Sequence, residues 1–216
     1  RFTGHGRQPS AMADATVARW MDDVGEAIKI GKQIGETVII MATSTGGTLA
    51  AAAALDKAAM EHIGGIIFIS PNFAINSRAA NLLTWPFARQ WVPLVIGTEQ
   101  KGNPRNDLHA HYWMMTYPTT ALMPMAAIVA AVDRESYDDV DMPALFYYSR
   151  QDQVVAPEKT AAFARSWGGE SKSIIASLTA DDDKFSHIIA GDIVSPNQTA
   201  SAVEHMVAWI TGLQNR

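Results

Sequence analysis

Three residues whose side chains can carry out nucleophilic catalysis occur in order along the chain: Ser44, Asp152 and His187. A serine hydroxyl becomes a nucleophile when a histidine accepts its proton, and a carboxylate bonded to that histidine orients the ring and balances its charge. Such a set attacks carbonyl carbons and forms an acyl-enzyme. The three residues are far apart in sequence, so the elements that carry them must bring them together.

Ser44 lies in the segment Ala42-Thr43-Ser44-Thr45-Gly46-Gly47, between a predicted strand and a predicted helix. A sharp strand-to-helix turn that exposes a serine needs small residues two positions before and two positions after it, and Ala42 and Gly46 meet that need. At such a turn the Thr45 N–H lies at a helix N-terminus, where it can stabilise an oxyanion. Alternatively, Ser44 only caps the helix, as serine often does. The motif alone does not decide between the two.

Asp152 and His187 also follow predicted strands, within residues 148–155 and 184–189. An aspartate in a loop is most often a turn former, and a half-buried histidine is most often structural, so neither is informative alone. The order Ser, Asp, His is informative, because each residue follows a successive strand and the carboxyl ends of parallel strands meet at one edge of a sheet. We therefore predict a catalytic triad.

The pattern of the elements predicts an α/β protein with a mostly parallel sheet and right-handed crossovers. Runs rich in β-branched and aromatic residues, typical of buried strands, alternate with amphipathic or Ala-rich stretches, typical of helices. Strands are predicted over residues 37–42, 65–70, 144–148 and 173–178. Helices are predicted from an N-cap at Asp14 to Gly35 and over residues 46–59, 157–167 and 198–213. Residues 1–6 have the character of the end of a strand.

The alternation stops between residues 73 and 141. This interval carries Trp85, Trp91 and Trp113, several prolines and four methionines between positions 114 and 125, without a clear strand. It is predicted to be a mostly helical insertion. The methionines and aromatic residues from Tyr112 to Met125 either line an acyl pocket or attach the insertion to the sheet, and the sequence favours neither.

Composition excludes several classes of function. With 216 residues the chain forms one domain with an insertion, and its 17 Lys and Arg against 22 Asp and Glu give a net charge of −5, which disfavours nucleic acid as a partner. Without cysteine there is no disulfide, thiolate metal site or cysteine nucleophile, and the compartment stays open. The longest apolar runs, residues 37–42 and 64–69, are too short to span a membrane.

Four segments resemble the α/β-hydrolase superfamily, in particular its esterase, monoacylglycerol-lipase and serine-aminopeptidase-like branch. They are Thr3-Gly4-His5-Gly6, Thr43-Ser44-Thr45-Gly46-Gly47, Arg150-Gln151-Asp152-Gln153-Val154-Val155 and Ser186-His187-Ile188-Ile189. The resemblance implies Ser44 as the nucleophile, His187 as general base and then acid, and Asp152 as the residue that orients His187. It also implies a core of residues 1–72 and 142–216 and a helical cap or lid of residues 73–141 over the pocket, without cofactor or metal.

The resemblance is incomplete at the oxyanion hole. In that family the first oxyanion donor comes from a loop after the third strand, which precedes the segment that Thr3-Gly4-His5-Gly6 resembles. His5 and Gly6 are not taken as that loop, because the helix and the Ser44 turn follow them too soon for an intervening strand. We therefore expect residues 1–216 to hold the C-terminal two-thirds of the fold without its N-terminal strands. Only the Thr45 N–H is assigned, and the second donor is expected from an upstream segment or a second chain.

The predicted function is a serine hydrolase that cleaves carboxylic esters of apolar acyl or alcohol groups, with a small-molecule or lipid-like substrate. One alternative is a serine peptidase or amidase of the same fold, which needs acidic residues to bind a free amino group. Candidates for that role are Glu99, Asp107, Asp133 and Glu135. Another alternative is a non-catalytic binding protein with a degenerate site.

Three further features receive plain structural interpretations. His109 and His111 lack a carboxylate at ligand spacing, so they are not predicted to bind a metal. The run Asp181-Asp182-Asp183 is predicted to be a solvated acidic loop that tilts the field near His187. His205 is predicted to be a surface or packing residue.

Overall fold

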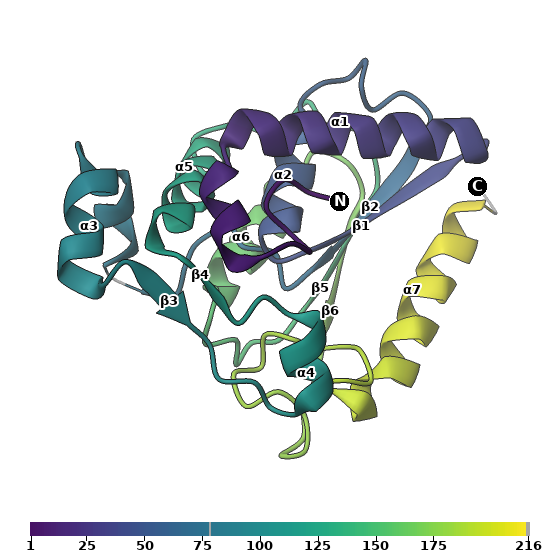
Figure 1. Cartoon of the computed structure of the whole chain (residues 1–216). Coiled ribbons are helices and arrows are strands. Elements are labelled where there is room, and N and C mark those ends of the chain that lie inside the picture. The colour runs from purple at the N-terminus through teal and green to yellow at the C-terminus, as the bar shows by residue number, and fades with distance from the viewer. Residues whose placement is uncertain (78, 215–216) are drawn as a thin grey trace.

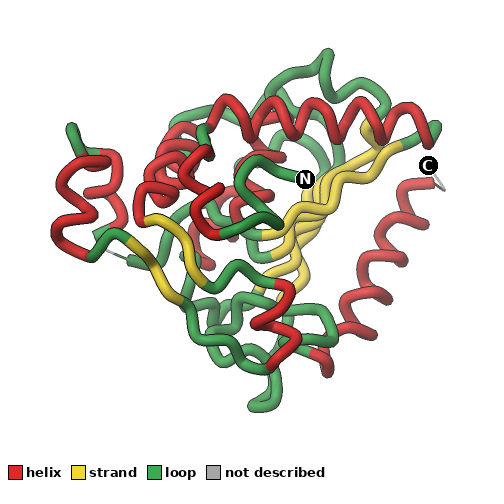
Figure 2. The backbone as a smooth tube through the Cα atoms, in the orientation of Figure 1, coloured by secondary structure: helices red, strands yellow, loops and turns green. Residues whose placement is uncertain are grey.

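A four-stranded parallel sheet forms the centre of the protein, seen here in a computed structural model that describes residues 1–77 and 79–214 (Figures 1 and 2). Its order is β1-β2-β5-β6. The strands are β1 (Val38–Thr43), β2 (Ile63–Ile69), β5 (Ala144–Tyr148) and β6 (Ser171–Ile175). The predicted fold class, an α/β protein with a mostly parallel sheet, is confirmed.

Alternate residues of the central strands face two separate cores, as the two-residue period of a strand requires. Phe68 and Phe146 face the larger core, which contains side chains of α1 (Val17–Ile34), α2 (Thr45–Ala54) and α5 (Leu122–Val132). Ile67, Leu145 and Tyr147 face the smaller core, which is covered by α7 (Thr199–Gln214). Helices thus cover both faces of the sheet, which explains why its central strands are continuous apolar runs.

Aromatic rings fill the larger core. The rings of Phe68 and Phe146, on neighbouring strands, stack with centroids 4.8 Å apart. Phe73 stacks at 3.8 Å on Phe163 of α6 (Pro157–Arg165), and Trp167 meets Phe68 edge-on at 5.6 Å. These pairs tie the segment after β2 and the helix after β5 to the sheet, so the loops between them start from fixed points.

The strand register brings the carboxyl ends of the strands together at one edge. Thr43 pairs with Ile69, Ile69 with Tyr147, and Tyr147 with Ile174. The residues that follow β1 and β5 therefore emerge side by side, as the sequence analysis assumed.

Several predicted boundaries are wrong at the ends of elements. Thr16, not Asp14, caps α1 and accepts a hydrogen bond from Arg19 N–H, because Asp14 ends a preceding 3-10 helix (Pro9–Asp14). The helix predicted over residues 46–59 ends at Ala54, and the strand predicted over residues 173–178 is β6. Residues 1–6 form turns rather than a strand end, with positive φ angles at Gly4 and Gly6.

The predicted insertion is partly wrong in its secondary structure. It contains η2 (Ala80–Thr84), α3 (Ala88–Ile96), α4 (Asp107–Tyr112) and η3 (Thr119–Ala121), but also β3 (Glu99–Lys101) and β4 (Thr116–Pro118). These two strands pair in antiparallel fashion and form a separate two-stranded sheet. We call residues 73–121 the cap segment. The predicted cap of residues 73–141 stays a prediction, and α5 within it packs in the larger core.

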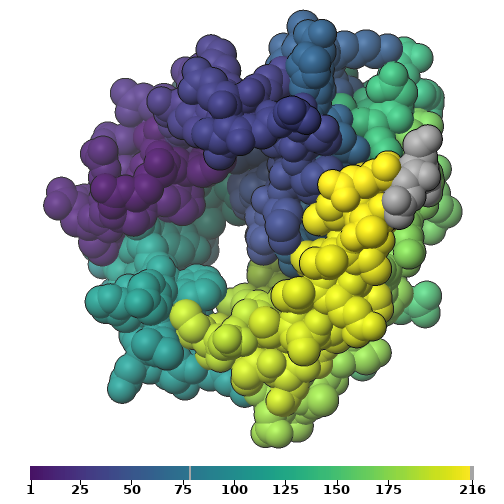
Figure 3. Space-filling model, turned by 90° about the vertical axis from the view of Figure 1, so that its right-hand side faces the viewer, coloured from purple at the N-terminus to yellow at the C-terminus, as the bar shows by residue number. Residues whose placement is uncertain are grey.

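The outer edge of the sheet is open at β1. Met41 of this strand is 58% exposed, and Val203 and Val207 of α7 are also exposed. The space-filling view shows a hollow between α7 and the N-terminal half of the chain (Figure 3). In the described residues, no helix combines the length and the apolar character needed to cross a membrane.

Candidate active site

Ser44 lies in a strained turn between β1 and α2. Its backbone angles are φ 51° and ψ −123°, a left-handed conformation that costs a non-glycine residue about 1–3 kcal/mol. The turn is held by the Ser44 N–H, which donates to Ile69 C=O at 3.0 Å, and by the Ser44 C=O, which accepts from the N–H groups of Gly47 and Asn72. The Ser44 side chain makes no capping hydrogen bond to α2. Helix capping therefore does not account for the hydroxyl.

The need for small residues around this turn falls on Gly47 rather than on Gly46. A Cβ at Gly47 would lie 2.8 Å from the Cβ of Pro71, which follows β2, so α2 can approach the sheet only with glycine there. A Cβ at Gly46 would meet no atom within 4 Å. The reason given for Gly46 in the sequence analysis is wrong, because Gly46 faces open space.

The structure brings the three predicted residues of the triad together. His187 Nε2 lies 3.1 Å from Ser44 Oγ, and His187 Nδ1 lies 2.8 Å from Asp152 Oδ2. Asp152 is only 4% exposed. Its other oxygen, Oδ1, accepts from the N–H groups of Val154 and Val155 at 2.8 and 2.9 Å. The carboxylate is therefore fixed by the backbone on one side and faces the imidazole on the other.

The acidic run before His187 is buried, which contradicts the predicted solvated loop. Asp182 and Asp183 are 1% and 8% exposed. Asp182 Oδ2 accepts from Thr179 N–H, from Thr179 Oγ1 and from Gln198 Nε2. Burial by itself raises the pKa of Asp182, but these hydrogen bonds outweigh burial and lower that pKa below its usual value. The run is thus part of the loop's internal structure.

A largely apolar cavity of about 500 Å³ lies beside the turn, at Thr45 and Gly46. Its other lining residues come from the N-terminal segment, α1, α2 and the region from β4 to α5: Arg1, Phe2, His5, Gly6, Met12, Trp20, Leu49, Tyr117, Ala121, Leu122 and Met125. None of these described residues is an aspartate or a glutamate. Burial in this region raises the pKa of Tyr117, which therefore stays a neutral phenol at ordinary pH.

The segment from Tyr112 to Met125 serves in part each of the two purposes left open above. Tyr117 and Met125 line the cavity and also pack against the larger core. Tyr112 and Trp113 are exposed. The segment thus both attaches the cap segment and shapes the cavity, and its first aromatic residues do neither.

Thr45 is the first residue of α2, a position whose N–H has no carbonyl partner within its own helix. Asn72, which sequence reasoning treated only as the end of a strand, lies beside it: its Nδ2 is 3.5 Å from Thr45 Oγ1 and 3.3 Å from Met125 Sδ. Asn72 is buried, and its backbone N–H holds the Ser44 carbonyl. A polar residue directly after a buried strand, opposite the Ser44 turn, was the available signal.

The remaining candidates lie away from the cavity. His109 Nδ1 accepts from Arg105 N–H, and His205 Nδ1 lies 2.7 Å from Ser201 O; both histidines are exposed. The described residues contain no cluster of three or more His, Cys, Asp or Glu able to hold a metal ion. The four candidate acidic residues for peptide binding are exposed and do not line the cavity: Glu99, Asp107, Asp133 and Glu135.

Comparison with known proteins gives a family and a fold. Residues 2–178 match the family model described as serine aminopeptidase, S33. A search of curated proteins found no match.

Among solved structures, similar folds occur in three enzymes. One was reported with the metagenome-derived lipolytic enzymes LipS and LipT, with 21% identity and a TM-score of 0.73 over 98% of this chain and 80% of that chain. A soluble variant of monoglyceride lipase from Saccharomyces cerevisiae has 13% identity and a TM-score of 0.70 over 99% and 75%. Est1E from Butyrivibrio proteoclasticus has 16% identity and a TM-score of 0.58 over 94% and 73%. At these identities the likeness concerns the fold.

Proposed function

Because the chain belongs to the serine aminopeptidase S33 family of α/β-hydrolases, we propose that it is a serine hydrolase that cleaves carboxylic esters of apolar acyl or alcohol groups. The observation that carries this proposal is the hydrogen-bonded series from Ser44 Oγ through His187 to Asp152, beside an apolar cavity. Distances of 3.1 and 2.8 Å are within the range in which a base accepts a proton from a nucleophile.

In the proposed mechanism, Ser44 Oγ attacks the ester carbonyl while His187 Nε2 takes its proton. The Thr45 N–H donates to the oxyanion that forms. When the tetrahedral intermediate collapses, His187 protonates the leaving alcohol, and an acyl group remains on Ser44. His187 then activates a water molecule, which releases the acid. Asp152 holds the ring in the tautomer with the proton on Nδ1 and balances its positive charge.

The cavity supports an ester with apolar groups over a peptide with a free amino end. A positively charged amino group needs a carboxylate partner, and the described lining has none. Leu49, Leu122 and Met125 instead present apolar side chains next to Thr45. The peptidase alternative would require a carboxylate from outside the lining. The non-catalytic alternative is disfavoured by the strained turn, since a binding protein gains nothing from the cost of φ 51° at Ser44.

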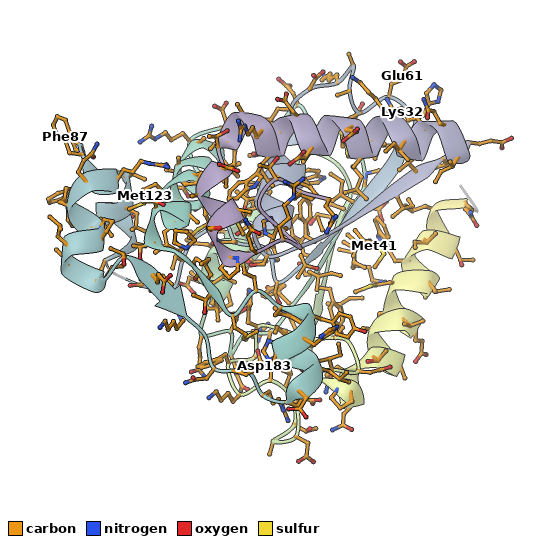
Figure 4. All side chains as sticks on the ribbon, in the orientation of Figure 1. Lys32, Met41, Glu61, Phe87, Met123 and Asp183 are labelled. Carbon is orange, nitrogen blue, oxygen red and sulfur yellow. The ribbon has the colours of Figure 1, made fainter. Side chains whose placement is uncertain are left out.

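We further propose that the edge of β1 is completed by a strand from polypeptide outside residues 1–216, which also supplies the second oxyanion donor. This edge is at the end of the sheet order, and exposed apolar side chains lie on it and on α7. In Figure 4 the Met41 side chain lies on the side of β1 that faces α7. An uncovered edge of this kind offers unpaired backbone groups to another strand.

A fluorophosphonate probe tests the nucleophile, because it reacts with activated serines. We expect the parent to be labelled and Ser44→Ala to be unlabelled, while Ser77→Ala, a control at an exposed serine, keeps full labelling. Hydrolysis of p-nitrophenyl esters of increasing acyl length, compared with aminoacyl p-nitroanilides, tests the substrate class. A folded parent that is not labelled, or that prefers the anilides, contradicts the proposal.

A further inference from the structure

Asp183 is a nearly buried carboxylate that the proposed mechanism does not use. Its Oδ2 accepts from the N–H groups of His187 at 3.0 Å and Ile188 at 2.9 Å, and its Oδ1 lies 3.3 Å from the N–H of Phe185. Figure 4 shows it among the loops that lie beside α4. One side chain thus holds the backbone on both sides of His187.

We propose that Asp183 is a positioning residue, which fixes the main chain of His187 so that the ring reaches Ser44 Oγ. The inference rests on the proposed function of the triad. Asp152 fixes the ring of His187 at Nδ1, and Asp183 fixes its backbone at N–H. The imidazole of His187 is therefore held at two points by two different carboxylates, and the direction of Nε2 depends on both.

The loop needs such an anchor because its backbone is strained next to the histidine. Ser186 has a φ of 53°, a left-handed conformation that serine rarely adopts. Ionised carboxylates form stronger hydrogen bonds to N–H groups than neutral acceptors do. Removing Asp183 leaves three N–H groups without their acceptor, so the strained conformation at Ser186 loses its support.

A second set of contacts closes the same loop around Asp183. The Asp183 N–H donates to Ser195 Oγ at 3.0 Å, and that hydroxyl donates to the carbonyl of Ile188. From the cap segment, the guanidinium of Arg105 donates to the carbonyls of Asp181, Asp182 and Val194. Asp183 therefore occupies the centre of a loop that is fixed at its outer ends, which makes its carboxylate the link to His187.

Three variants in the full chain separate this role from general stability. Asp183→Ala removes all three bonds. Asp183→Asn keeps the shape but turns one oxygen, an acceptor, into an NH₂ group that faces an N–H. Asp181→Ala is the matched control, because Asp181 is in the same acidic run and its side chain is exposed.

The test is steady-state hydrolysis of p-nitrophenyl butyrate together with hydrogen exchange of the amides of residues 185–190. For Asp183→Ala we expect kcat to fall by about 10- to 100-fold with KM within about twofold, because a small misplacement of a catalytic group lowers the rate of the chemical step. We expect a smaller fall for Asp183→Asn and no change for Asp181→Ala. The amides of His187 and Ile188 are expected to exchange at least about tenfold faster in Asp183→Ala.

A kcat of Asp183→Ala within twofold of the parent overturns the inference, as does an equal loss in Asp181→Ala. A rise in KM with kcat unchanged overturns it too. If Asp183→Ala does not fold, Asp183→Asn decides by the same criteria. A parent that hydrolyses no ester contradicts the proposed function instead, and the exchange measurement then decides separately whether Asp183 holds His187. Unchanged exchange in Asp183→Ala refutes that role.

Discussion

The loops at the carboxyl ends of the strands and the outer part of the cap segment are built in opposite ways. Asp152 and Asp183 are nearly buried, and each carboxylate accepts hydrogen bonds from more than one group. In contrast, Phe87 and Leu94 of the cap segment are 78% and 85% exposed, and Phe87 lies at the outer tip by α3 (Figure 4).

This difference shows where the fold requires fixed geometry. A triad works only when its atoms stay within hydrogen-bond distance, so its loops are closed by many buried bonds. An apolar cavity accepts substrates by shape and area, which tolerates more movement of the groups around it. Changes in the strand-end loops should therefore have large effects, and the same changes in the outer cap segment small ones.

The largest effect is expected at Asp152. An amide at this position favours the wrong tautomer of His187, so we expect Asp152→Asn to lower kcat/KM for p-nitrophenyl esters by about 10⁴-fold. Asp133→Asn, at an exposed carboxylate at the end of α5 that pairs with Lys159, is the control and should stay within twofold. A loss below tenfold in folded Asp152→Asn would mean that the triad does not operate as proposed.

Next in size is the loss of one aromatic ring from the core. Phe146 is fully buried and stacks on Phe68, so Phe146→Ala should lower the free energy of unfolding by about 3–5 kcal/mol. Phe87→Ala makes the same change on the outer cap segment and should alter it by no more than about 0.5 kcal/mol. Urea unfolding of both variants measures the contrast, which equal losses would remove.

A smaller effect separates two adjacent glycines of α2. Gly47→Ala places a Cβ 2.8 Å from Pro71 and should cost about 1–3 kcal/mol through overpacking. Gly46→Ala meets no atom within 4 Å and should stabilise the helix slightly, by up to about 1 kcal/mol. Melting temperatures in one buffer test the order. Since Gly46 lines the cavity, its variant should also shift the preferred acyl length, which the ester series reports.

The pH dependence of stability provides the last contrast. Because the folded-state pKa of Asp182 is lowered, its carboxylate stabilises the fold above the unfolded value of 3.8, and that contribution is lost as the pH falls through the folded-state pKa. Asp182→Asn should thus be less stable than the parent by about 1–2 kcal/mol at pH 7, and the gap should narrow below pH 3.8. Unfolding curves at pH 7, 5 and 3 measure it. A gap that stays constant with pH contradicts this account.

The sequence predicted the sheet well because its signals are local. The buried runs of β2 and β5 and the small residues after β1 identify parallel strands and a sharp turn without knowledge of distant contacts. The same reasoning selected Ser44, Asp152 and His187, whose side chains lie within hydrogen-bond distance of one another, while their catalytic roles stay predictions.

The errors arose where partners come from far along the chain. Asp182 and Asp183 have the composition of a solvated loop, yet Gln198 and Arg105 help to bury their segment, and no local pattern announces that contact. The strands β3 and β4 have three residues each, too few for a period of two to be seen. Gly47 is required by Pro71, which is adjacent only in the folded chain.

The conformation of Ser44 has a consequence for the history of such a protein. Glycine adopts a φ of 51° without the steric cost that serine incurs, so the fold by itself would favour glycine at this position. Selection for hydrolysis and selection for stability therefore act in opposite directions on one residue. A lineage released from selection for activity is expected to replace Ser44 early and to keep the sheet, the helices and the His187 loop intact.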